Sequence, residues 1–245
     1  MQLRDFGFLR PAWLAVQAIS RRCGFEVTYA RVTGIPDADL YWPFFQPWRA
    51  KRWDSILRSG DPRSLVLAPE KYILLRHAED AVVRCPGDFA ECGVYRGGTA
   101  YLLAELAAKH NRRVSLFDTF EGMPETDPTK DRHKQGDFAD VSLAGVQQYL
   151  SPFNNVDYFP GLIPGTLAAV SDRRFCFVHI DLDIYNSIHA ATEFFYPRMA
   201  SGGVIVYDDY GYPSCPGARM AIDEFYSGKC EIPTVIGPQC IVRKL

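Results

Sequence analysis

Phe89-Ala90-Glu91-Cys92-Gly93-Val94-Tyr95-Arg96-Gly97-Gly98-Thr99 is the stretch of this chain that decides the fold. An apolar run leads into a turn with three glycines, and residues 99–110 follow with the spacing of an amphipathic helix. A strand, a glycine turn and a helix N-terminus in this order let a ligand approach the backbone closely. The glycine spacing is not the G-x-G-x-x-G of a dinucleotide site. The turn therefore predicts a nucleotide-like ligand, with a purely structural tight turn as the alternative.

The segments downstream alternate between short apolar runs and helix-length amphipathic stretches. This alternation is typical of βαβ units around a parallel sheet. A hairpin signal, Gly237-Pro238, lies near the C-terminus. We therefore predict an α/β fold of the doubly wound, Rossmann-like kind, with a mostly parallel seven-stranded sheet, helices on both faces and an antiparallel C-terminal hairpin. The expected strands are 89–94, 114–118, 156–160, 175–181, 203–207, 234–236 and 239–242, and the expected helices are 69–83, 99–110 and 187–198, the last capped by Asn186 or Ser187.

Residues 1–68 differ from residues 69–245, because they hold all four tryptophans and show no clean strand pattern. We expect a helical N-terminal extension over 1–68, with contacts to substrate or to a second subunit, and a ligand-binding α/β domain over 69–245. Because contacts to a second subunit are expected, we also expect the protein to form a homo-oligomer. The apolar positions with helical spacing are Leu9, Trp13, Val16 and Ile19, and the aromatic residues expected to pack or form dimer contacts are Tyr41, Trp42, Phe44, Phe45 and Trp48.

Composition excludes several classes of partner. The 245 residues carry a formal net charge of −2 with both signs interspersed, so no long-range field attracts nucleic acid or anionic lipid. Seven cysteines without a C-x-x-C pair argue against a disulfide framework or a thiolate zinc site and suggest reduced thiols. The apolar run 11–19 is too short to cross a membrane. We expect a cytoplasmic protein that acts on a small molecule, without nucleic acid or a membrane span.

Two acidic residues strengthen the prediction of a cofactor site. Asp118 ends the strand 114–118, at the position where a carboxylate accepts hydrogen bonds from ribose hydroxyls. Its alternative role is a helix or turn cap. Glu91 places a charge inside an apolar strand and could pair with the ammonium of a methionine moiety. Together these residues favour a nucleoside-bearing cofactor over a structural turn.

Four aspartates follow two of the expected strands, as Asp181-Leu182-Asp183 and Asp208-Asp209. If the strands are neighbours, the four carboxylates meet at one edge of the sheet, where their repulsion favours a bound cation. Oxygen ligands without a nearby cysteine or an evident histidine pair indicate Mg²⁺, or similarly Mn²⁺ or Ca²⁺. The alternative is that these aspartates cap loops and the next helix.

Two histidines have different expected roles. His179 lies inside a predicted strand, so a core histidine with satisfied hydrogen bonds is expected there rather than a ligand. His133 lies in the long polar segment 121–140 and is a candidate for substrate binding or proton transfer, with simple solvation as the alternative.

Four ordered motifs resemble the macrocin O-methyltransferase (TylF/MycF) family of class I S-adenosylmethionine-dependent methyltransferases. They are Gly87-Asp88-Phe89-Ala90-Glu91-Cys92-Gly93-Val94-Tyr95-Arg96-Gly97-Gly98, Phe117-Asp118-Thr119-Phe120-Glu121-Gly122-Met123-Pro124, His179-Ile180-Asp181-Leu182-Asp183-Ile184-Tyr185, and Gly202-Gly203 through Asp208-Asp209-Tyr210. The resemblance spans about residues 65–245 and implies a class I methyltransferase domain over 69–245. It also implies an O-methyltransferase that uses S-adenosylmethionine and a divalent metal such as Mg²⁺, and that acts on a hydroxyl of a sugar or glycosylated natural product.

The resemblance implies roles for individual residues as well. Asp181, Asp208 and Asp209 are implied as metal ligands, with Asp181 also near the cofactor and the reaction, and Asp183 as the general base. The implied cofactor-binding residues are Glu91, Gly93, Tyr95, Gly97, Gly98 and Thr99 at the methionine end, Asp118 at the ribose, and Asp137, Phe138 and Gly161 near the adenine.

Two other functions remain open at the level of sequence. A glycosyltransferase could use Asp181-Leu182-Asp183 as a D-x-D motif that holds a metal-bound nucleotide-sugar, although the glycine turn, Glu91 and Asp118 would then have no task. A non-catalytic scaffold could bind the cofactor alone. A catechol-type mechanism is disfavoured, because Ile184 stands where the similar catechol O-methyltransferases carry a lysine.

Overall fold

The computed structural model describes residues 19, 45–59 and 63–245. The chain divides into two units, residues 1–54 and 55–245. The 3₁₀ helix η3 (Pro47–Arg49) and helix α2 (Lys51–Arg58) occupy the stretch between the two undescribed gaps. The predicted division at residues 68 and 69 stays a prediction. Of the expected amphipathic helix, the structure describes only Ile19. Tyr41, Trp42 and Phe44 also lie outside the described residues.

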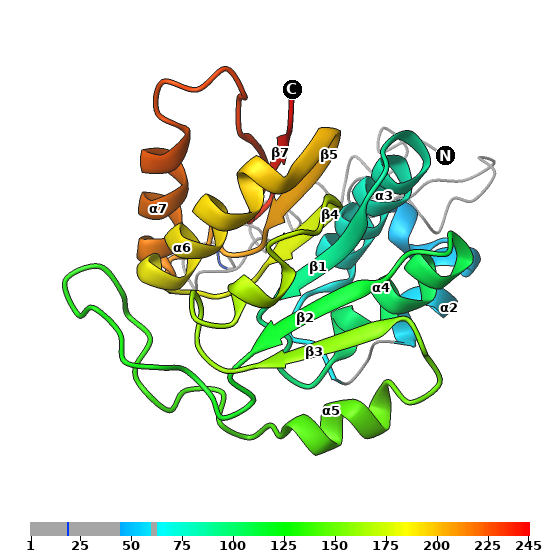
Figure 1. Cartoon of the computed structure of the whole chain (residues 1–245), viewed down its shortest axis with the longest axis horizontal. Coiled ribbons are helices and arrows are strands. Elements are labelled where there is room, and N and C mark those ends of the chain that lie inside the picture. Colours follow the sequence, from blue (N-terminus) through cyan, green and yellow to red (C-terminus); the bar gives the residue numbers. More distant parts are fainter. Residues whose placement is uncertain (1–18, 20–44, 60–62) are drawn as a thin grey trace. The chain divides into compact units, whose positions relative to one another are not determined.

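A seven-stranded sheet forms the centre of residues 55–245, in the order β3-β2-β1-β4-β5-β7-β6 (Figure 1). The first five strands run parallel, and β7 pairs antiparallel with both β5 and β6. The predicted mostly parallel sheet with a C-terminal hairpin is confirmed. Its strands are β1 (Asp88–Cys92), β2 (Val114–Asp118), β3 (Val156–Pro160), β4 (Phe175–Ile180), β5 (Met199–Tyr207), β6 (Thr234–Ile236) and β7 (Gln239–Arg243).

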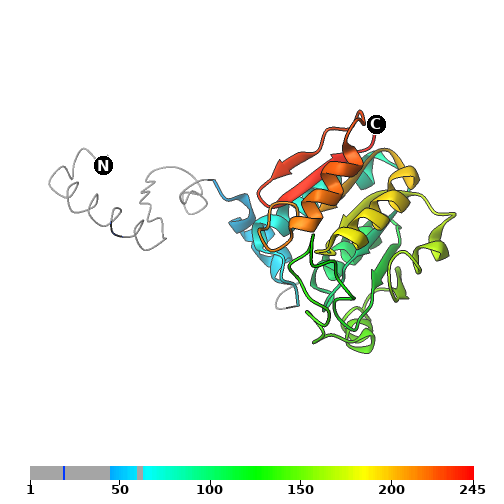
Figure 2. The ribbon, with the colours of Figure 1, turned by 90° about the vertical axis from the view of Figure 1, so that its left-hand side faces the viewer.

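Helices cover both faces of the sheet, which explains why the central strands are mostly apolar. On one face, α3 (Ala68–Arg84) contacts β4 and β5, and α4 (Gly98–Lys109) contacts β1 and β2. On the other, α6 (Tyr185–Phe195) packs on β4 and lies beside α7 (Pro216–Tyr226), as Figure 2 shows. All six residues of β4 are buried between these layers. Three short helices complete the fold: α5 (Leu143–Tyr149), η4 (Leu167–Val170) and η5 (Tyr196–Arg198).

Strand order reverses between β1 and β4, because β2 and β3 extend the sheet on one side of β1 and the chain then returns to the other side. Ligands of doubly wound sheets bind beyond the strand ends at such a reversal. Gly93 follows β1 and has a φ of +86°. A Cβ at Gly93 would overlap the backbone carbonyl of Asp181, which follows β4. Glycine therefore allows the glycine turn and the first aspartate motif to meet at the reversal.

The N-terminus of α6 differs from the prediction. The helix begins at Tyr185, and neither Asn186 nor Ser187 caps it. The N–H of Tyr185 instead donates to Asp131 Oδ1 at 2.9 Å, a carboxylate that lies 54 residues earlier in the chain. A helix start of this kind has no local sequence signature, because its free N–H group is satisfied by a distant loop.

Candidate active site

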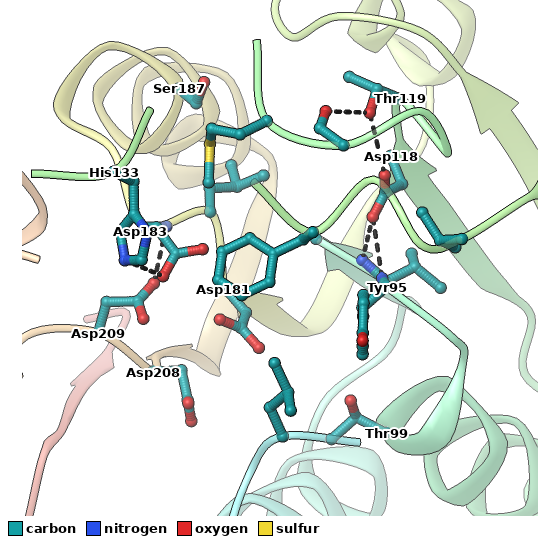
Figure 3. A pocket seen from close by; sticks show the side chains of 18 of the residues that line it. Tyr95, Thr99, Asp118, Thr119, His133, Asp181, Asp183, Ser187, Asp208 and Asp209 are labelled. Atoms are coloured by element: carbon teal, nitrogen blue, oxygen red, sulfur yellow. Dashed lines mark hydrogen bonds and ion pairs between the residues drawn. The ribbon is translucent and has the colours of Figure 1, made fainter. Parts of the chain in front are cut away.

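A cavity of about 480 Å³ lies at the reversal of strand order. Its volume falls in the range of small-molecule sites. Segments that follow each of the five parallel strands, β1 to β5, line it, together with residues 63–67 and part of the loop 119–141 (Figure 3). Glu91, Gly97, Gly98 and Asp137 are not part of the lining. The predicted site residues that do line the cavity are Gly93, Tyr95, Thr99, Asp118, His133, Phe138, Gly161, Asp181, Asp183, Asp208 and Asp209.

Asp118 holds the glycine turn against the end of β2. Its Oδ2 accepts the N–H groups of Val94 and Tyr95 at 2.6 and 3.0 Å, and its Oδ1 accepts that of Phe120 at 2.7 Å. The structure thus includes the capping role that was the alternative for this residue. Asp118 also faces the cavity from the wall opposite the aspartate cluster (Figure 3), so a ligand-binding role remains a proposal.

Glu91 pairs with His179 inside the sheet. The two side chains are fully buried, with His179 Nδ1 2.9 Å from Glu91 Oε1. Burial raises the pKa of Glu91, and the hydrogen bond to His179 opposes this rise. Burial alone would lower the pKa of His179, but its interactions with Asp208 and Glu91 raise it to about 9. His179 is therefore a buried partner of two carboxylates, and the second oxygen of Glu91 has no hydrogen-bond partner among the described residues.

The ligating atoms of Asp181, Asp183 and Asp209 lie within 4.8 Å of one another. Burial and then the charge of Asp209 raise the pKa of Asp181. Burial and then the charge of Asp183 raise that of Asp209. A divalent cation would relieve this repulsion, and carboxylate oxygens are the ligands that Mg²⁺ prefers. The residues present therefore fit a hard divalent cation.

Asp208 is oriented differently from its neighbours. Its Oδ1 accepts a hydrogen bond from Gln239 at 2.7 Å and lies 3.8 Å from His179 Nε2. The tight carboxylate group therefore contains Asp183 in addition to the predicted ligands Asp181 and Asp209, while Asp208 lines the cavity beside it. The assignment of Asp208 as a metal ligand stays a prediction.

Asp183 has a left-handed backbone, with a φ of +60°. This conformation is uncommon outside glycine and is found where surrounding contacts enforce it. Here the N–H of Asp183 donates to Asp209 Oδ2 at 2.9 Å. The contact turns the Asp183 carboxylate into the cavity. Burial raises its pKa, and the nearby His133 opposes that rise.

His133 and Cys215 meet Asp183 on the far side of its carboxylate. Cys215 Sγ lies 3.3 Å from Asp183 Oδ1, and His133 Nε2 lies 3.5 Å from the same oxygen. The prediction that no cysteine accompanies the aspartates is therefore wrong. Cys215 is 32 residues beyond Asp183 in sequence and precedes α7, so no motif marks it. The one available signal is Pro216, which starts a helix soon after the Asp208-Asp209 strand end.

The rest of the lining is mostly apolar and escaped sequence analysis. Residues 63–67 contribute Leu65 and Leu67, which are 63% and 58% exposed even though they border the cavity. Phe138 was implied by the family resemblance, but not its backbone φ of +61° or the edge-on contact of its ring with Tyr95, whose centroid lies 6.1 Å away. No pattern of spacing predicted these contacts, because the segments that carry them are irregular.

Solved structures of similar fold define the class. The O-methyltransferase NovP superposes with a TM-score of 0.67 at 23% identity, over 78% of this chain and 88% of that one. A calicheamicin methyltransferase superposes with a TM-score of 0.61 at 20% identity, over 86% of this chain and 87% of that one. The fold is thus the Rossmann-like fold of methyltransferases. No helix among the described residues is long and apolar enough to cross a membrane.

The chain belongs to the macrocin-O-methyltransferase (TylF) family, whose profile matches residues 73–235. A tetracenomycin derivative 4'-O-methyltransferase of Streptomyces olivaceus is 31% identical over 147 residues, 54% of this chain and 56% of that protein. The mycinamicin III 3''-O-methyltransferase of Micromonospora griseorubida is 28% identical over 169 residues, 62% of this chain and 65% of that protein. The matched regions thus span less than two thirds of these relatives.

Proposed function

We propose that this protein is an S-adenosylmethionine- and divalent-metal-dependent O-methyltransferase that acts on a hydroxyl of a sugar or glycosylated natural product. The observation that carries the proposal is one cavity that joins a glycine turn to a cluster of buried and partly buried carboxylates. Family membership supports methyl transfer over the D-x-D glycosyltransferase. The relative from Streptomyces olivaceus is named for a rhamnosyl-bearing tetracenomycin, which supports the acceptor class.

The cofactor would bind along the glycine turn. Gly93, Tyr95 and Thr99 line this wall, where the helix N-terminus of α4 favours an anionic group such as a carboxylate. Asp118 is suited to ribose hydroxyls, because its oxygens face the cavity beside their backbone partners. Glu91 is buried behind this wall and would influence cofactor binding without lining the cavity. The contacts of Asp137 and Phe138 with an adenine ring are proposed by family resemblance.

The carboxylate wall would carry the chemistry. Asp181 and Asp209, with Asp208 beside them, would hold the cation. When bound, S-adenosylmethionine supplies an activated methyl group and the cation lowers the pKa of the acceptor hydroxyl. Asp183 accepts the hydroxyl proton, a task for which a raised pKa suits a carboxylate near neutral pH. His133, next to Asp183, orients the base or the acceptor.

The test separates binding from chemistry. Calorimetry with S-adenosylhomocysteine, with and without Mg²⁺, measures cofactor affinity, and methyl transfer to glycosylated acceptors measures turnover. We expect Asp183→Asn to lower kcat by about 10²- to 10⁴-fold, the usual contribution of a general base, with little change in affinity for S-adenosylhomocysteine. Asp223→Asn, an exposed carboxylate on α7 outside the cavity, is the matched control and should keep full activity.

Each competing function predicts a different result. Full turnover in EDTA would remove the metal from the mechanism. Binding of UDP in place of S-adenosylhomocysteine would support the glycosyltransferase, and cofactor binding without transfer to any acceptor would support the scaffold. Cytoplasmic location, a homo-oligomer and an acceptor-binding role for residues 1–68 remain predictions for separate measurements.

A further inference from the structure

Three atoms of different chemical type form a small triangle in the cavity. Cys215 Sγ lies 3.3 Å from Asp183 Oδ1 and 3.6 Å from His133 Nε2, and His133 Nε2 lies 3.5 Å from Asp183 Oδ1. The same three atoms thus make all three contacts. The residues come from the loop after β2, the end of β4 and the residue before α7, so the fold rather than a local motif assembles the triangle.

The dimensions of this triangle match a tetrahedral metal site. Zinc bonds of about 2.3 Å to sulfur and about 2.1 Å to nitrogen or oxygen place the ligand atoms roughly 3.4 to 3.6 Å apart. The observed edges of 3.3, 3.5 and 3.6 Å lie close to this range. All three residues line the cavity, so a fourth coordination position would face the space for a ligand. Three protein ligands and one open position are typical of zinc sites that bind exogenous groups.

A second feature of zinc sites is also present. Histidine ligands of metals usually donate their other ring N–H to a carboxylate, which fixes the ring and the tautomer. His133 Nδ1 lies 3.2 Å from Asp137 Oδ2, and that carboxylate also accepts the N–H of Lys134 at 2.9 Å. Asp137 thus holds the His133 ring with Nε2 directed at Asp183 and Cys215. The arrangement needs no rotation of His133 to receive a cation.

We propose that His133, Asp183 and Cys215 form a binding site for a thiophilic divalent cation such as Zn²⁺, adjacent to the hard-oxygen group of Asp181, Asp183 and Asp209. Sulfur and imidazole ligands favour zinc and cobalt over magnesium. The site with Cys215 and His133 therefore prefers soft cations, and the carboxylate group prefers hard ones. The thiol binds as thiolate, and its proton passes to solvent as the metal enters. Without a cation, burial and the charges of Asp209 and Asp183 raise the pKa of Cys215 and keep it protonated.

The two metal groups share Asp183. A zinc ion at His133 and Cys215 therefore occupies the carboxylate that serves as the base, and zinc inhibits methyl transfer. This inhibition rests on the proposed function, whereas metal binding at the triangle does not. The closing experiment accordingly measures binding first and turnover second.

The binding experiment uses the full chain, stripped with chelator and then saturated with Mg²⁺ to fill the hard-oxygen group. Titration with Co²⁺ is followed by the sulfur-to-cobalt charge-transfer absorption in the near ultraviolet, which reports a thiolate ligand. We expect the band in the wild-type protein and in Cys230→Ser, an exposed cysteine outside the cavity, and its loss in Cys215→Ser. Asp137→Asn should weaken Zn²⁺ affinity, measured against a chromophoric chelator, by about tenfold or more.

The same variants can also disprove the proposal. Absence of the band in the wild-type protein, or its persistence in Cys215→Ser, would overturn it. If Cys215→Ser fails to fold, His133→Gln replaces it, and unchanged Zn²⁺ affinity in that variant would equally overturn the site. In the turnover assay, the inhibition constant for Zn²⁺ should rise by about tenfold or more in Asp137→Asn. If zinc binds at the triangle but no methyl transfer occurs in any assay, the site stands and the proposed function fails.

Discussion

The carboxylates on the two walls of the cavity, the glycine turn with Asp118 and the cluster around Asp181 and Asp209, have opposite electrostatic surroundings. On the turn wall, backbone N–H groups donate hydrogen bonds to both oxygens of Asp118. On the carboxylate wall, burial and the charges of neighbouring carboxylates raise the pKa values of Asp181 and Asp209. The protein itself supplies hydrogen-bond donors to the carboxylate of the first wall, whereas the repulsion on the second would be relieved by the proposed cation. The contrast predicts that an Asp-to-Asn substitution changes the free energy of unfolding in opposite directions on the two walls.

The largest effect is expected where the two walls meet. Gly93→Ala would place a Cβ against the Asp181 carbonyl and would force alanine into a φ of +86°. Backbone strain and overpacking each cost about 1 to 3 kcal/mol, so we expect a loss of about 4 kcal/mol in the free energy of unfolding. Denaturant unfolding and soluble yield measure this loss.

Gly228→Ala is the matched control for this prediction. Gly228 has a φ of +78°, but no described atom lies within 4 Å of the position that a Cβ would take, so only the left-handed backbone is penalised, by about 1 kcal/mol. Equal losses in the two variants would show that the close approach of β1 and β4 is not what requires glycine at position 93.

The next effect tests the turn wall. Asp118→Asn replaces one carboxylate oxygen that accepts a backbone N–H with an amide NH2 that cannot accept, so a backbone donor loses its partner. We expect the free energy of unfolding to fall by about 1 to 3 kcal/mol in chelator. Asp140→Asn, on an exposed carboxylate paired with Arg96, should change it by less than about 0.5 kcal/mol. If Asp118→Asn leaves the free energy of unfolding unchanged, the glycine turn keeps its conformation without the Asp118 cap.

The smallest effect has the opposite sign. Asp181→Asn removes one of the repelling carboxylates, and we expect the metal-free protein to gain stability, by less than the loss expected for Asp118→Asn. Because the folded pKa of Asp181 lies above its ordinary value of 3.8, its contribution is fully present below that value and is lost as pH rises through the folded pKa. The variant should lack this part of the decline.

Melting temperature against pH, in EDTA and in Mg²⁺, measures the difference. Mg²⁺ should stabilise the wild-type protein more than Asp181→Asn, because the cation relieves the repulsion that the substitution has already removed. A loss of stability in metal-free Asp181→Asn would contradict the view that this wall is strained. So would an equal response of the two proteins to Mg²⁺.

The same contrast explains how far the sequence could predict the molecule. The turn wall is contiguous from Phe89 to Thr99, so its strand, turn and helix were each visible in the order of residues. The sheet was predictable for a similar reason, because buried parallel strands are short and continuously apolar. The carboxylate cluster at Asp181 and Asp209 was accessible through strand ends, since neighbouring parallel strands bring them together.

What escaped prediction is held by contacts between irregular segments. Cys215 reaches Asp183 only because of where α7 begins, and Asp131 caps α6 from a loop without a periodic pattern. The pairing of Glu91 with His179 depends on strand register, which places these two residues directly opposite each other in β1 and β4. Spacing within one segment carries no information on such distances between segments.

The loop after β2 offers a practical consequence. Its two arms are joined at Met123, whose N–H donates to Asp137 O and whose carbonyl accepts the N–H of Gly136, at 2.7 and 2.9 Å. Asp131 fastens the intervening part to the first turn of α6. The loop is thus closed at its base and could be exchanged between relatives as one segment. Any such exchange carries His133 with it, so under the proposed zinc site it would also change the response of the protein to trace zinc.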